Sequence, residues 1–213
     1  MKERTMTAVW ATILLFTALR GGCADTNFLQ AIRYTPPAGY GGYFGLDGGA
    51  PSDNLFSGEG PGFMCSSRDH TSFIVFQLGL VGFYFSNGKI MKFHPVGAAE
   101  LKQSLELTFK GKFPTMTPAV IGNMSGLTVA DLTAQRPPGS PPTLLRACWV
   151  QVGSNAVLKV TAASSDPDAF RELTNSIGKL TIDKSKMEEC VRLQLKAEGA
   201  TNDSRHQGGA AQQ

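Results

Sequence analysis

Runs of β-branched and aromatic residues, separated by glycine-containing turns, occupy the middle of the chain. Residues 72–86 read SFIVFQLGLVGFYFS, and Asn87-Gly88 follows directly. Because Asn-Gly accepts the positive φ angles of a type I′ turn, the pattern predicts a hairpin with strands at about 80–86 and 89–93. The uncharged run is too short to span a membrane and is rich in strand formers, so we expect it to form buried sheet.

Apolar residues at three- and four-residue spacing predict helices on both sides of a second block of strands. The first helix runs from Pro95 to Gly111, and the second opens at Ser165-Asp166-Pro167 and stops at Gly178. Met187–Ala197 predicts a last helix, although the alternation in CVRLQLK also fits a strand. The apolar stripes are Ala98, Leu101, Leu105, Thr108 and Phe109 in the first helix, and Phe170, Leu173 and Ile177 in the second.

The block between these helices predicts two antiparallel strand pairs. PAVIGN and GLTVADLTAQR flank a turn at Met124-Ser125, and TLLRACWVQVG and AVLKVTAAS flank Ser154-Asn155. Apolar residues alternate along the second pair, which gives it one face for packing. The intervening RPPGSPP at 136–142 predicts an exposed turn, because proline cannot serve a central strand. Leu180–Ile182 predicts a short final strand.

The segment before these strands is dominated by glycine and proline. Residues 36–63 predict a long loop, since glycine costs entropy on ordering and proline removes a hydrogen-bond donor. Tyr40, Tyr43 and Phe44 are interleaved with the glycines and are candidate ligand-binding residues if they line a cavity. The alternative is that the loop is a flap that covers the core.

The first 24 residues have the pattern of a signal peptide. Lys2 and Arg4 precede an uncharged stretch at 5–19, which is shorter than the roughly 20 residues of a membrane span. Gly22 and Ala24 are the small residues that signal peptidase accepts, so we expect cleavage after Ala24 and export to the periplasm or the exterior.

Cys23 leaves a second form of export open. A bacterial lipoprotein carries an aliphatic residue three places before its lipidated cysteine, and here Arg20 holds that place while Leu19 lies one position too early. A contact with the membrane is therefore expected only if Cys23 is lipidated.

Composition suits one domain with a real core. The chain has 213 residues, of which 42% are hydrophobic and 17% charged. We divide it into a signal peptide (1–24), an N-terminal segment that packs on the domain (25–69), an α+β domain (70–197) and a disordered tail (198–213). Outside the signal peptide 17 basic and 16 acidic residues remain, a net charge of +1, so we expect no nucleic-acid partner.

Candidate chemistry is sparse. Cys65, Cys148 and Cys190 allow at most one intramolecular disulfide, and their spacing fits no zinc, haem or redox motif, so we expect no metal and no cofactor. Cys65 with His70 or His94 is the best nucleophile–base set, which makes a thiol-dependent hydrolase or redox enzyme the alternative function. No nucleophile signature surrounds that cysteine, and we expect no catalytic residues.

The order of elements from residue 70 to about 183 resembles the PsbP/Mog1-like α/β/α sandwich family. The similarity is carried by GNMSGL at 122–127, WVQVG at 149–153 and FRELTNSIGKLTI at 170–182. The resemblance implies an antiparallel sheet flanked by helices. It also implies a protein that acts by binding other proteins or supporting larger assemblies. We therefore expect an exported, non-catalytic binding or accessory module with an unknown protein or envelope partner.

Overall fold

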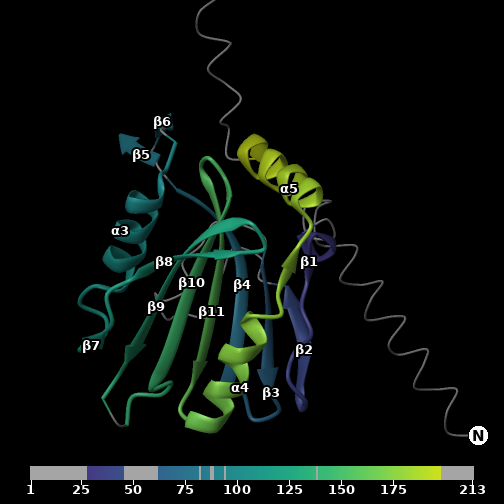
Figure 1. The fold of residues 1–213 in the computed structure, drawn as a ribbon, viewed down its shortest axis with the longest axis vertical. Helices are drawn as coiled ribbons and strands as arrows, with labels where there is room; N and C mark the ends of the chain where they lie inside the picture. The colour runs from purple at the N-terminus through teal and green to yellow at the C-terminus, as the bar shows by residue number, and fades with distance from the viewer. Residues whose placement is uncertain are drawn as a thin grey trace, which may run out of the picture.

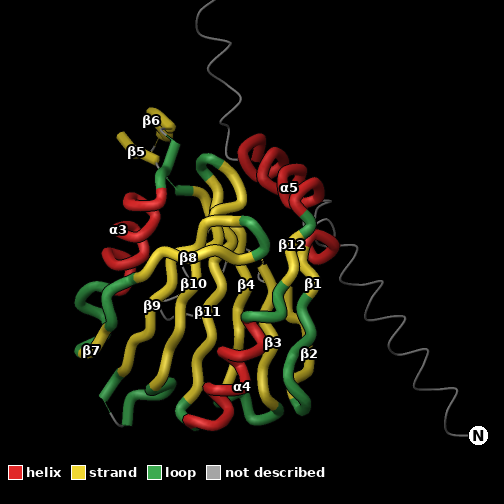
Figure 2. The backbone as a smooth tube through the Cα atoms, viewed as in Figure 1, coloured by secondary structure: helices red, strands yellow, loops and turns green. Residues whose placement is uncertain are grey.

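An antiparallel sheet of eight strands forms the centre of the computed structural model, which describes residues 28–45, 62–81, 83–86, 89–93, 95–137 and 139–197. Figures 1 and 2 show the sheet with helices packed against it. Its order is β2 (Tyr40–Gly45), β3 (Gly62–Ser67), β4 (Ser72–Leu80), β11 (Ala156–Ser164), β10 (Leu144–Gly153) and β9 (Leu127–Gln135), with β7 (Thr115–Met116) and β8 (Val120–Met124) both on the far side of β9. The predicted α+β class is confirmed.

Helices cover both faces of this sheet. α4 (Pro167–Ile177) and α5 (Lys184–Ala197) pack on the face we call the α4 face, and α3 (Ala98–Phe109) packs on the opposite α3 face. Successive side chains of a strand point to opposite faces, so each strand contributes to both cores. On β10, Cys148 and Val150 pack in the core under α4, and Ala147 and Trp149 pack in the core under α3.

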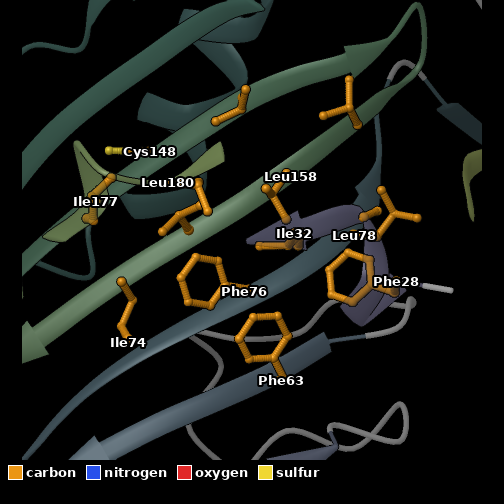
Figure 3. Packing of buried hydrophobic residues seen from close by; sticks show 14 of the residues in the cluster. Phe28, Ile32, Phe63, Ile74, Phe76, Leu78, Cys148, Leu158, Ile177 and Leu180 are labelled. Atoms are coloured by element: carbon orange, nitrogen blue, oxygen red, sulfur yellow. The ribbon is translucent and has the colours of Figure 1, made fainter. Parts of the chain in front are cut away.

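Aromatic rings fill the centre of the core on the α4 face. The ring of Phe76 on β4 stacks on Phe63 of β3 at a centroid distance of 4.6 Å and lies 4.7 Å from the ring of Tyr34. The ring of Phe28 meets the ring of Phe63 edge-on, with a centroid distance of 6.1 Å. Figure 3 shows these phenylalanines beside Ile32, so residues from the N-terminal segment complete the core.

The predicted hairpins form, with small shifts. β5 (Phe83–Ser86) pairs with β6 (Lys89–Phe93) as a separate two-stranded sheet, because residues up to Leu80 pair along β11 instead. The β8–β9 turn falls on Ser125-Gly126, one residue later than expected, with φ angles of +54° and +77°. The β10–β11 turn lies at Ser154-Asn155 as predicted.

The helices also agree with the sequence pattern. Leu101, Leu105 and Phe109 are buried on α3, and Gly111 follows the helix with a φ of +80°. Asp166 caps α4 by accepting a 2.8 Å hydrogen bond from the amide of Asp168. The last segment is helical rather than extended, since the residues that it buries are spaced for a helix: Met187, Cys190 and Gln194.

The prediction of a loop over residues 36–63 is wrong for residues 40–45 and 62–63, which form strands. Tyr40–Gly45 is the outermost strand on one side of the sheet, and β3 begins at Gly62. The pairing of β2 with β3 shifts register between Gly41 and Phe44, and glycine within a strand commonly marks such an irregularity. The sheet thus extends into the segment 25–69, and β1 (Ile32–Arg33) pairs with β12 (Thr181–Ile182).

Several sequence predictions fall outside the described residues. These are the signal peptide with Cys23, the base candidate His94 and the tail at 198–213. Among the helices that the structure describes, none is both long and apolar enough to cross a membrane.

Candidate functional site

The structure does not bring Cys65 and His70 together. Cys65 on β3 points into the core on the α4 face, opposite Ile74. Ser66 is the next residue and faces the other way, and its hydroxyl lies 2.8 Å from Nδ1 of His70. Burial also raises the pKa of the Cys65 thiol to about 11, the opposite of what an activated nucleophile needs.

The other two thiols are also buried and unactivated. Burial raises the pKa of Cys148 on β10 and of Cys190 on α5. All three cysteines are free, so the disulfide considered from the sequence is not formed. β4 and β11 separate Cys65 from Cys148, and at a strand spacing of about 4.8 Å their backbones lie roughly 14 Å apart, too far for a disulfide.

Tyr40, the described member of the predicted ligand set, lies at the margin of the core. Its side chain is half-buried and packs against the core on the α4 face, and this burial is the main reason why its hydroxyl pKa is raised. The side chains of Tyr43 and Phe44 lie outside the described residues, so a ligand site there stays a prediction. The described residues hold no cluster of histidine, cysteine, aspartate or glutamate suited to a metal ion.

A largely buried ion pair between Arg146 and Asp131 links the sheet to α4. The Arg146 guanidinium donates to the Asp131 carboxylate through Nε at 3.1 Å and through Nη2 at 2.5 Å, and it donates through Nη1 to the carbonyl oxygen of Thr174 in α4 at 3.2 Å. Asp131 raises the pKa of Arg146. Both side chains are about three-quarters buried and satisfied by each other, so the pair serves structure.

A shallow hollow lies between α5 and the tip of the β8–β9 hairpin. Even with the open solvent above it included, its volume is about 240 Å³, below the roughly 300–1,000 Å³ of small-molecule sites. Its lining is formed by Leu127, Val152, Ile182, Lys184, Met187 and Glu188. This hollow is too small to enclose an organic ligand.

Exposed apolar side chains lie on β8 and on α3, at the opposite end of the sheet order from β2. Val120 and Ile121 on β8 are 63% and 43% exposed, and Leu107 on neighbouring α3 is 58% exposed. A 2.9 Å hydrogen bond from the amide of Ala119 to Oε1 of Glu106 holds the start of β8 against α3. As successive residues of a strand, Val120 and Ile121 point to opposite faces of the sheet, so an exposed apolar side chain lies on each side of the β8 backbone.

The backbone of β8 is open on the side away from β9. In a hairpin with a two-residue turn, hydrogen bonding alternates from the pair that flanks the turn, here Met124 and Leu127. Gly122 and Val120 therefore also bond to β9, whereas Ile121 and Asn123 direct their N–H and C=O groups away from it. No described strand pairs with that outer side. We call these five residues of β8 the open edge.

The open edge lacks the charges that usually protect a sheet margin. From Phe113 to Ala130 the sequence contains no charged residue. Native proteins commonly place lysine, proline or a bulge at such positions. Pro118 interrupts the ladder between β7 and β8, but no such device lies within Val120–Met124. The sequence predicts this strand but not that the strand lies exposed at the margin of the sheet. The long uncharged stretch around it is the sequence feature that could have indicated this exposure.

Comparison with known proteins gives only a weak structural similarity. No family model and no curated protein matches the chain. Among solved structures, the solution structure of cyanobacterial PsbP (CyanoP) from Synechocystis sp. PCC 6803 is similar, with a TM-score of 0.39 and 8% identity over 72% of this chain and 93% of that chain. The chain is thus weakly similar to a PsbP structure, as its sequence suggested.

Proposed function

We propose that this protein is an exported, non-catalytic binding or accessory module that docks a protein partner through the open edge of β8. The observation that carries the proposal is the exposure of Val120 and Ile121 beside outward-directed backbone groups. Main-chain hydrogen bonds supply affinity when a strand is added to a sheet, and flanking apolar side chains supply burial. Together they favour an extended segment of protein as the ligand of this surface.

The buried thiols support a role without catalysis. A thiol enzyme needs its cysteine within hydrogen-bond reach of a base, roughly 2.6–3.2 Å, and needs a lowered thiol pKa. Cys65 is on the opposite side of its strand from the residue that binds His70, and its pKa is raised. No described contact favours the enzyme alternative.

Export rests on the N-terminal sequence and has a direct test. Protein purified from its native host should have an intact mass that begins at Asp25. A mass that corresponds to a chain beginning at Cys23 with added acyl chains would show that the exported protein is tethered to a membrane. A mass that includes Met1–Ala24 would overturn the signal-peptide prediction.

Docking through the open edge predicts that Ile121→Lys abolishes assembly. The new ammonium group would lie where a partner strand must approach and would have to lose its water, whereas in the free protein it stays solvated. After chemical cross-linking in extracts of the native host, the wild-type chain should elute from a sizing column above its own mass, and the Ile121→Lys variant should elute as a monomer.

Leu29→Lys is the matched control, because Leu29 is 44% exposed and lies on the N-terminal segment rather than on the open edge. This variant should elute like the wild type, and circular dichroism should show the same fold for all three chains. A wild-type chain that elutes as a monomer, or equal losses in both variants, would contradict docking through β8.

A further inference from the structure

We infer that the occupant of the open edge is a second copy of this chain, with the two β8 strands paired antiparallel to form one continuous sheet. This inference rests on the proposed function, since it names the partner of the same surface. It is carried by the length, hydrogen-bonding pattern and lack of charge of Val120–Met124.

The open edge matches itself in register. Pro118 bounds it before Val120, and the turn at Ser125-Gly126 bounds it after Met124. A twofold axis through Gly122 sets Ile121 opposite Asn123 of the second copy, so residues with outward backbone groups meet each other and can exchange hydrogen bonds. All five residues of each strand then have a partner.

The side chains fit the same arrangement. In this register Val120 lies opposite Met124 of the second copy, which gives an apolar pair at each end of the ribbon. A Cβ atom built on Gly122 would meet nothing within 4 Å, so the backbone at the axis is uncrowded. With no charge between Phe113 and Ala130, the two paired strands themselves set no like charges opposite each other.

The size of the contact sets its strength. Two five-residue strands bury less than the 1,200–2,000 Å² or so of a standard stable interface. We therefore expect a reversible dimer whose fraction rises with protein concentration, rather than a permanent one.

The register can be tested by disulfide trapping with two single-cysteine additions to the full chain, Gly122→Cys and Val120→Cys. Opposed residues in a non-hydrogen-bonded antiparallel pair have Cα atoms about 4.5 Å apart, which suits a disulfide. The two Val120 positions are four residues apart along the ribbon, about 13 Å. Both sites are exposed, so accessibility does not distinguish them.

Under mild oxidation of the purified chain, Gly122→Cys should give a covalent dimer at least about tenfold more readily than Val120→Cys or the wild type. Adding Ile121→Pro, which removes an outward N–H and leaves the bonds to β9 intact, should abolish trapping of Gly122→Cys. Circular dichroism checks that each variant is folded. Equal trapping of both cysteines, or none at Gly122, would overturn the twofold pairing; if Ile121→Lys still dissolves the assembly in host extracts, the docking function stands and its partner is another protein.

Discussion

Replacing Phe76 with alanine should lower the free energy of unfolding by about 3–5 kcal/mol. Phe76 is fully buried on the central strand β4, where its ring stacks on Phe63 and contacts the tilted ring of Tyr34. Removing its ring takes away contacts with β3 and with the N-terminal segment together. The neighbours are held by other strands and cannot collapse fully into the space, so a cavity cost adds to the lost burial.

Urea unfolding followed by circular dichroism measures this loss. Leu107→Ala is the control, because Leu107 lies exposed on α3 and its truncation should change stability by no more than about 0.5 kcal/mol. If Phe76→Ala cost less than about 1 kcal/mol, the aromatic cluster would not be the centre of the core.

Phe76 also illustrates which parts of the fold could be predicted from the sequence. The strand that contains it, the β10–β11 hairpin and helices α3 and α4 follow from local signals, namely periodicity, turn residues and caps. Its partner Phe63 lies in a segment that reads as loop because of its glycines. Whether such a segment forms a strand depends on its pairing with β4. The local sequence pattern contains no information about that long-range contact.

The same limit applies to the candidate site. The sequence predicts a strand around Val120 and Ile121, yet exposure depends on which strands lie outside β9, a property of the assembled sheet. Tyr40 packs at the margin of the core, whereas the side chains of Tyr43 and Phe44 lie outside the described residues, so a ligand site at these aromatic residues remains a prediction.

The fold explains why none of the three described cysteines is activated. Strand alternation places Cys65 and Cys148 on the α4 face, and helical spacing turns Cys190 toward the same core. Each is held protonated by its surroundings, because an ionised thiolate would lie in apolar packing without water. The alternation and helical spacing that build the core therefore also bury these thiols and keep them unreactive.

Raising the pH should destabilise the protein through these thiols, by about 2 kcal/mol at pH 10.5 from Cys65 alone. The Cys65 pKa is about 11 in the fold against 9.0 for an ordinary thiol. Since the folded pKa is the higher one, the stabilisation is fully present below pH 9. It is lost between pH 9 and pH 11, as the unfolded chain ionises first. Cys148 and Cys190 act in the same direction.

Urea unfolding of the wild type and of Cys65→Ala at pH 8 and pH 10.5 isolates this contribution. Lysine and tyrosine titrations are common to both chains, and the cost of the smaller side chain cancels when each variant is compared with itself. The fall in the free energy of unfolding should be smaller in Cys65→Ala by about 2 kcal/mol. Equal falls would mean that the Cys65 thiol ionises as readily in the folded protein as in the unfolded chain, and a reactive cysteine at this position would again have to be considered.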